Sequence, residues 1–269
     1  MNFTQLVIGF LLSLGVAFIA YKKEKLTISG LFSAILLGTI VYGLGSWIFY
    51  VWLMIFFMSS LLIQKIVVVL LPRKQTEKHS ARNWIQVFAN GGLLGLISII
   101  YFFYPTDLIV FATALSMAAS TSDTWASEIG SLSTDIPYGL ISRKSITKGL
   151  SGGVTRLGLW ASFWGSTFIS FTYLILVTMM RGVQLNLLYM ALLCCLGGFM
   201  GSIVDSILGE LVQAKYLDDH LEVVESKHNH QEKLIHGYSW LDNNMVNLLS
   251  NLIVVLLFSA LLSVTGWIK

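Results

Sequence analysis

The sequence predicts an all-α integral membrane protein, a polytopic helical bundle of about eight spans that forms a single domain over residues 1–269. Hydrophobic residues make up 55% of the chain and charged residues only 12%, about half the charged share of a soluble domain. The apolar residues also gather in runs that are long enough for membrane-spanning helices, which need about 20 residues each. The charges lie mostly between these runs.

The expected spans cover nearly the whole chain. In order they are 3–21, 27–43, 46–71, 84–104, 107–128, 155–180, 186–213 and 245–268. The second and fifth runs show the weakest span pattern. The fifth ends in polar residues, so it is expected either to cross fully or to form a broken or re-entrant helix. The polar segments 72–83, 130–154 and 214–244 are expected to be loops.

The first run reads as a span because no basic segment precedes it and no cleavage site clearly follows it, as a signal peptide would require. No extension resembling a transit peptide precedes it either, which favours the plasma membrane of a bacterium or archaeon. The only two cysteines, Cys194 and Cys195, are adjacent within the seventh span, which excludes a disulfide framework.

The basic residues predict the orientation in the membrane. Cytosolic loops carry an excess of lysine and arginine, and fourteen of the seventeen basic residues fall on one side of the expected bundle, with two on the other and Lys65 within a span. Both termini are therefore expected outside, and the long polar segments in the cytosol. The fourteen are Lys22, Lys23, Lys25, Arg73, Lys74, Lys78, Arg82, Arg143, Lys144, Lys148, Arg156, Lys215, Lys227 and Lys233.

Two spans carry acids, which are costly in a membrane and are functional candidates for that reason. In the seventh span, Asp205 continues a row of small residues at four-residue spacing that starts at Gly197 and Gly201. In the fifth, Asp123 continues a similar row from Ala119. Such rows share one helix face and allow close approach of another helix. We expect these faces to pack together and to bring Asp123 and Asp205 close to each other.

Two aspartates at close range repel each other unless a cation lies between them. Mg²⁺ is commonly held by one or two carboxylates together with substrate phosphates, so the pair predicts a magnesium site. The alternative is a pair of acids with purely structural hydrogen bonds. Glu128 is a candidate third catalytic acid, whereas Glu210 is expected to lie off the row of Asp205.

A glycine-rich segment enters the sixth span. Backbone N–H groups at such a segment and the start of the helix behind it favour an anion, and the nearby lysines add positive charge. The alternative is an ordinary glycine-rich turn, and no Walker A sequence is present. The candidate phosphate-binding residues here are Lys144, Thr147, Lys148, Gly149, Ser151, Gly152 and Gly153.

Asparagines supply further candidates at the cytosolic ends of two spans. Asn244 and Asn247, with Asn243, open the eighth span, where they either cap the helix or line the site. Asn90 is a polar group that enters the fourth span and needs a partner.

Six stretches, in order along nearly the whole chain, resemble the transmembrane protein 19-like family of integral membrane proteins. The most specific is Asp-Thr-Trp-Ala-Ser-Glu at 123–128. The family includes the phytyl-phosphate kinases of plant and cyanobacterial tocopherol synthesis. The resemblance therefore implies a phosphotransferase that converts an isoprenyl monophosphate to its diphosphate. The stretches are 56–60, 82–91, 119–130, 149–154, 201–209 and 243–247.

The sequence analysis therefore predicts a membrane-embedded prenyl-phosphate kinase with Mg²⁺ as its cofactor. Its expected partners are a nucleoside triphosphate, with CTP and ATP both open, an isoprenyl phosphate lipid and membrane lipids. No nucleic acid is expected, and assembly as a homo-oligomer stays open. The alternative is a transporter or flippase for a lipid phosphate or another anionic solute, since intramembrane acids and broken helices fit that class too.

Overall fold

The computed structural model describes residues 3–70, 81–218, 222–225 and 233–265, and within these ranges it confirms the all-α fold. Seven of the described helices are long and apolar enough to cross a membrane, when α2 and its π-helical continuation η1 (Val41–Gly45) are taken together. The long helices are α1 (Phe3–Lys22), α2 (Ile28–Ile40), α3 (Trp47–Leu70), α4 (Trp84–Phe103), α5 (Asp107–Gly130), α6 (Arg156–Arg181), α7 (Leu185–Leu211) and α8 (Asn243–Val264).

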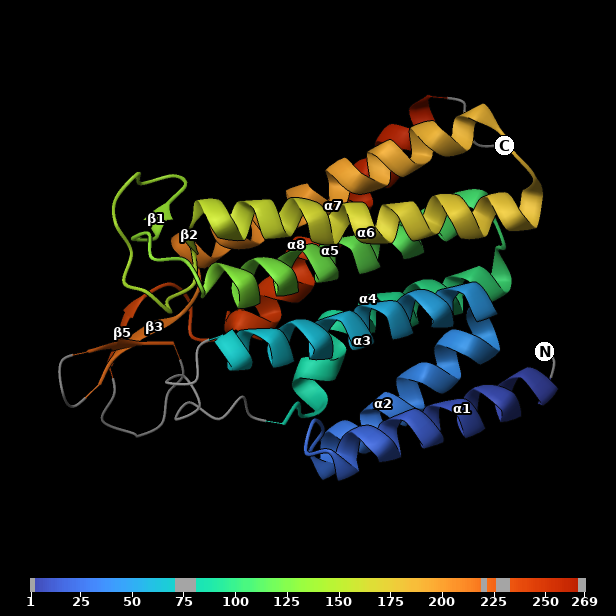
Figure 1. Ribbon diagram of the computed structural model, residues 1–269, viewed down its shortest axis with the longest axis horizontal. Helices are drawn as coiled ribbons and strands as arrows, with labels where there is room; N and C mark the ends of the chain where they lie inside the picture. Colours follow the sequence, from blue (N-terminus) through green and yellow to red (C-terminus); the bar gives the residue numbers. More distant parts are fainter. Residues whose placement is uncertain (1–2, 71–80, 219–221, 226–232, 266–269) are drawn as a thin grey trace.

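The long helices run alongside one another, and their connections divide between two ends of the bundle (Figure 1). At one end α1 begins and α8 ends; we call this the terminal end. At the other end lie the turn between α1 and α2, the start of α4 and the two long segments after α5 and α7; we call this the loop end. This arrangement agrees with the alternation expected from the basic residues.

The central helix is α5, which packs against α3, α4, α6, α7 and α8. Every residue from Val110 to Ser122 is buried. The sequence left a broken or re-entrant helix open here, but α5 is one uninterrupted helix of 24 residues, about 36 Å long at 1.5 Å per residue. A helix surrounded by other helices does not face lipid. It can therefore carry serine, threonine and aspartate at positions where an outer helix would need apolar side chains.

The loop end contains two small antiparallel sheets that the sequence did not predict. In the first, β1 (Tyr138–Gly139) pairs with β2 (Gly153–Val154). In the second, β3 (Lys215–Leu217) lies between β4 (Val223–Val224) and β5 (Lys233–His236). These strands have two to four residues each, too few to leave a periodic signal in the sequence. They tie the glycine-rich segment and the segment after α7 to the helix ends.

Four helices that begin at the loop end, α2, α4, α6 and α8, have side-chain caps. The Thr27 hydroxyl caps α2 by accepting from the Gly30 N–H. The Asn83 side chain accepts from the Gln86 backbone N–H, and the Gln86 side chain accepts from the Asn83 backbone N–H, which forms a capping box for α4. The Thr155 hydroxyl caps α6 at Gly158. Asp242 caps α8 by accepting from the Met245 N–H at 2.9 Å, so the cap of α8 is an aspartate and not one of the asparagines that follow it.

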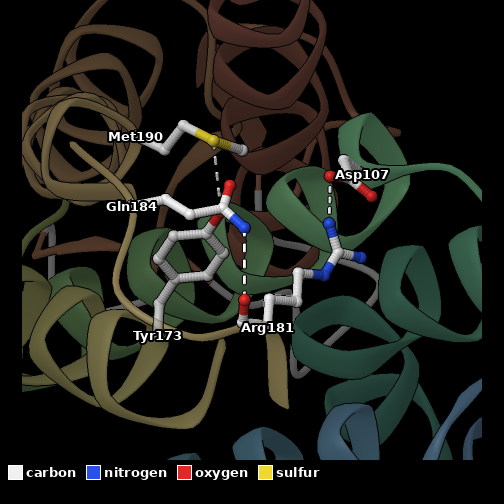
Figure 2. Close-up of polar contacts among 5 residues, drawn as sticks. All are labelled: Asp107, Tyr173, Arg181, Gln184 and Met190. Atoms are coloured by element: carbon white, nitrogen blue, oxygen red, sulfur yellow. Dashed lines mark hydrogen bonds and ion pairs between the residues drawn. The ribbon is translucent and has the colours of Figure 1, made fainter. Parts of the chain in front are cut away.

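The terminal end is held by polar contacts between α5, α6 and α7 (Figure 2). Arg181, at the end of α6, forms an ion pair with Asp107, the first residue of α5. The Gln184 amide donates to the Arg181 carbonyl at 3.3 Å, and the Tyr173 hydroxyl donates to the Met190 sulfur at 3.6 Å. Asp107 and Arg181 therefore neutralise each other at the terminal end, far from the loop end.

Candidate functional site

The small-residue rows of α5 and α7 pack against each other, as the sequence predicted. A Cβ atom built on Gly201 would lie 2.7 Å from the Cβ of Ala119, and one on Gly197 would lie 2.7 Å from a methyl of Leu115. Neither contact leaves room for a side chain. The two helices run in the same direction (Figure 1), so both rows advance together by four residues.

One step further along these rows, toward the loop end, stand Asp123 on α5 and Asp205 on α7. Each lies four residues beyond the contact between Ala119 and Gly201, at the next level of the two packed rows. Asp205 is buried, with 8% of its surface exposed, and Asp123 is partly buried. The close approach of α5 and α7 along these rows therefore places two acids on neighbouring helices inside the bundle.

The third helix at this site is α8, which holds Asp205. The Ser250 hydroxyl donates to Oδ2 of Asp205 at 3.0 Å. The Asn247 amide, with its nitrogen turned toward Asp205, donates to the same oxygen at 3.0 Å and to the Asn243 carbonyl at 2.9 Å. Among the described residues, the hydrogen bonds to Asp205 thus converge on one oxygen, so Oδ1 is the oxygen available to a cation. Asn247 was predicted either to cap α8 or to line the site, and here it contacts Asp205 and holds the orientation of that carboxylate.

A row of hydrogen-bonded polar groups, Ser116, Ser120 and Asn251, continues from the aspartates toward the middle of the bundle; we call it the polar seam. The Asn251 amide of α8 donates to the Ser120 hydroxyl at 3.0 Å and to the Ser116 carbonyl at 3.2 Å. The Ser120 hydroxyl in turn donates to the Asn90 carbonyl of α4 at 3.0 Å. Asn90 therefore meets α5 one turn before Asp123, and its own amide donates to the Gln86 carbonyl at 3.1 Å.

Glu128 lies on another side of α5. The Gln64 amide of α3 donates to its carboxylate at 2.9 Å, and its charge acts on the guanidinium of Arg82. Five residues separate Glu128 from Asp123, which is about 140° around a helix. The hydrogen bond from Gln64 thus comes from α3, whereas the hydrogen bonds to the Asp205 carboxylate come from α8.

The glycine-rich segment lies on the ends of α7 and α8, with Ser151 at its centre. The Ser151 backbone N–H donates to Oε1 of Glu225 at 2.5 Å, and its hydroxyl donates to Oε2 of the same carboxylate at 2.8 Å. The hydroxyl also accepts from the buried Gln213 amide at 3.0 Å, and the Lys215 ammonium donates to the Ser151 carbonyl at 3.3 Å. Ser151 thus presents two donors to an anion, and the anion bound there is a carboxylate.

Two glycines of this segment have identifiable backbone roles. Gly152 has a φ of +87° and lies so close to α7 that an added Cβ would meet the Glu210 backbone nitrogen at 2.5 Å. Gly149 has a φ of +97° and no atom within 4 Å of an added Cβ. Gly152 is therefore required for packing on α7, whereas Gly149 shapes an open turn. Gly153 belongs to β2, where an added Cβ would meet Pro137.

Glu210 anchors the neighbouring part of the same loop. Its carboxylate accepts from the backbone N–H groups of Ile141 and Ser142 at 3.0 and 2.7 Å. Glu210 therefore points away from the row that carries Asp205, as predicted, and a second carboxylate bonds to backbone N–H groups of this loop.

The other predicted phosphate-binding residues lie around the outside of the loop. Lys144 and Thr147 are exposed, and the Thr147 carbonyl closes a turn with Leu150 at 3.1 Å. The Lys148 ammonium donates to the Ser133 carbonyl at 2.5 Å. Asn244 donates to Asp242 at 3.1 Å, at the capped start of α8. The structure therefore does not gather all the predicted residues around one point.

The two aspartates do not enclose a metal ion by themselves. Among the described residues, no group of three histidine, cysteine or acidic side chains is arranged to hold a metal. Two carboxylates alone suit Mg²⁺, which keeps several waters and completes its shell with substrate phosphates. The pair Asp123 and Asp205 fits that mode of binding.

Sequence reasoning missed Ser250, Gln213 and Glu225. Ser250 could have been found, because Asn243, Asn247 and Asn251 form a four-residue polar row on an otherwise apolar helix and Ser250 lies beside it. Gln213 and Glu225 contact Ser151 across 62 and 74 residues of sequence. No local pattern indicates such pairings.

Comparisons with known proteins place this arrangement in a family. The family model described as integral membrane protein DUF92 matches residues 11–255, a range that holds both aspartates and the glycine-rich loop. The chain belongs to this family. Protein PGR of Arabidopsis thaliana is similar to this DUF92 chain, with 30% identity over 275 residues that cover 95% of each protein.

Uncharacterized membrane protein MJ0933 of Methanocaldococcus jannaschii is also similar, with 25% identity over 225 residues, 82% of this chain and 89% of that protein. No solved structure matches the chain. The DUF92 match and the similarity to Protein PGR confirm the family resemblance found in the sequence.

Proposed function

We propose that this protein is a prenyl-phosphate kinase of a bacterial or archaeal plasma membrane, with its site facing the cytosol. It would transfer a phosphoryl group from a nucleoside triphosphate to an isoprenyl monophosphate, such as phytyl, geranylgeranyl or farnesyl phosphate. The observation that carries the proposal is the pairing of Asp123 and Asp205 near the loop end. The similarity of the sequence to the family of the phytyl-phosphate kinases supports the choice of reaction.

Asp123 and Asp205 are assigned to Mg²⁺, which would neutralise the charge on the phosphate oxygens when bound. Asn247 and Ser250 fix the orientation of Asp205 through its Oδ2. Because both groups donate, they also stabilise the ionised carboxylate that metal binding requires.

The reaction joins two phosphates. A terminal oxygen of the lipid monophosphate attacks the γ-phosphorus, the bond from that phosphorus to the bridging oxygen breaks, and the nucleoside diphosphate leaves with that oxygen. The attacking oxygen is already ionised near neutral pH, so no strong general base is needed. Positioning and charge neutralisation supply most of the catalysis in such transfers.

The loop at 147–155 is assigned to the triphosphate, together with Lys144 and Lys148. Support comes from Ser151, whose N–H and hydroxyl already hold the carboxylate of Glu225. A phosphate presents the same kind of acceptor to these donors. In this proposal the triphosphate replaces Glu225 at Ser151.

A phosphotransfer screen tests the function. The purified protein is incubated with Mg²⁺, radiolabelled CTP or ATP, and phytyl, geranylgeranyl or farnesyl phosphate. We expect a labelled diphosphate from at least one lipid, and no product when EDTA replaces Mg²⁺. If every combination gives no labelled lipid while the protein stays folded, the proposed function is wrong.

A transporter or flippase for a lipid phosphate is the second candidate, and one observation favours it. The polar seam of Ser116, Ser120 and Asn251 continues beyond the aspartates toward the middle of the bundle, where a transport site is expected. A transporter would move a fluorescent lipid phosphate between the leaflets of a proteoliposome without nucleotide. A kinase would leave that distribution unchanged.

A further inference from the structure

The first four helices enclose a cavity that the aspartate site does not use. It lies between α1, α2, α3 and α4 and holds about 610 Å³ of empty space, its open mouth included. The walls are mainly apolar, with Leu37, Leu53 and Phe56 among the buried side chains that form them. An apolar cavity of this kind favours hydrocarbon over water.

One end of the cavity carries a cation. Arg82 lines it near the loop end, together with Gln86 of the first turn of α4. The backbone of Arg82 is held in place: its N–H donates to the Lys25 carbonyl at 3.0 Å, and its carbonyl accepts from the Thr27 N–H at 3.1 Å. The start of α4 adds the partial positive charge of a helix N-terminus. An arginine whose backbone is fixed and which lines an apolar cavity near the loop end suits a lipid with an anionic head.

The cavity also reaches the helix that carries the catalytic aspartate. Asn90 lines it, and the Asn90 carbonyl accepts from the Ser120 hydroxyl of α5. Ser120 precedes Asp123 by three residues, about 4.5 Å of helix rise. On the far side of α5, Ser151 and the glycine-rich loop lie against α7 and α8. The aspartates therefore stand between the cavity and the loop.

We propose that this cavity holds the single hydrocarbon chain of the lipid substrate, with Arg82 contacting its phosphate. The proposal rests on the kinase function and specifies its lipid site. It divides the molecule into a lipid half, α1 to α4, and a nucleotide half, α6 to α8, that meet at Asp123. A single apolar cavity between α1, α2, α3 and α4 suits a lipid with one hydrocarbon chain.

Filling the cavity should block lipid binding without changing nucleotide binding. Val87 lines the cavity and is partly buried, whereas Ile85, two residues earlier on α4, is 39% exposed on the outside. We expect Val87→Trp to weaken binding of farnesyl phosphate at least tenfold, and Ile85→Trp to change it less than twofold. If Val87→Trp does not fold, Ala34→Leu, which projects into the same cavity from α2, carries the same expectation.

Binding is measured by native mass spectrometry of the full chain without nucleotide, so it does not depend on catalysis. Arg82→Gln should weaken farnesyl phosphate at least tenfold and leave farnesol unchanged. Equal binding by wild type and both cavity variants would overturn the proposal, as would displacement of farnesyl phosphate by phosphatidic acid at equal concentration. If the cavity binds farnesyl phosphate but no nucleotide supports transfer, the kinase function is wrong and the lipid site stands. If transfer occurs and Val87→Trp leaves the KM for the lipid unchanged, the kinase function stands and the lipid site is wrong.

Discussion

At the residue scale, Asp123 and Asp205 are acids that a membrane bundle keeps at a cost. Asp205 has two donors, Asn247 and Ser250, on a single oxygen. These bonds hold the carboxylate but do not separate its charge from that of Asp123. A shared cation would remove the repulsion, and a purely structural role would not need the second charge.

Substituting each aspartate separates the two roles. We expect Asp123→Asn and Asp205→Asn each to lower phosphoryl transfer by at least a hundredfold at saturating Mg²⁺. The double variant should be little worse than either single one, because residues that act as one unit are strongly non-additive. Transfer rates and thermal midpoints of all three variants provide the measurement.

Asp107→Asn is the matched control, since Asp107 is an acid in the same helix that pairs with Arg181 at the terminal end. It should keep transfer within twofold of wild type. Substantial turnover by both single variants at the site would show that the pair holds no catalytic metal.

At the element scale, the parallel packing of α5 on α7 brings the two acids together. We expect Gly201→Leu to destabilise the protein by about 1–3 kcal/mol, the usual cost of overpacking, and to reduce transfer at least tenfold. The leucine side chain would clash with α5, because even a Cβ atom built on Gly201 would lie 2.7 Å from the Cβ of Ala119. Thermal unfolding in detergent and the transfer assay measure the two effects.

Gly15→Leu makes the same change on α1, where nothing lies within 4 Å of an added Cβ. It should leave both stability and transfer unchanged. If Gly201→Leu behaves like Gly15→Leu, close approach of α5 and α7 is not needed for the site.

The element scale also separates what the sequence could predict from what it could not. The outer helices were predictable because they face lipid and must be apolar. The packing of α5 on α7 was predictable because Ala119 and Gly201 lie on four-residue rows that include Asp123 and Asp205. The continuity of α5 was not, since a helix buried by its neighbours loses the apolar signal. The cavity and the contacts of Ser151 join segments far apart in the chain, and single-sequence patterns do not report such pairs.

At the scale of the whole molecule, the charges of the two ends differ. Ten of the basic residues predicted to be cytosolic lie within the described ranges, and all ten are at the loop end: Lys22, Lys23, Lys25, Arg82, Arg143, Lys144, Lys148, Arg156, Lys215 and Lys233. Lys65 stands near the same end of α3. At the terminal end, Arg181 is the basic residue within the described ranges, and Asp107 neutralises it. The asymmetry is therefore larger than a count of lysines and arginines suggests.

This asymmetry predicts that the loop end faces the cytosol, because positively charged segments are retained there. Single cysteines are introduced at Ser142, which is exposed at the loop end, and at Val183, which is 92% exposed at the terminal end, after Cys194 and Cys195 are changed to alanine. In intact cells, an impermeant maleimide should label the cysteine at 183 and should label the one at 142 only after permeabilisation. A nucleotide site at the loop end requires this orientation, because nucleoside triphosphates are supplied from the cytosol. Labelling of position 142 in intact cells would therefore contradict both the topology and the kinase.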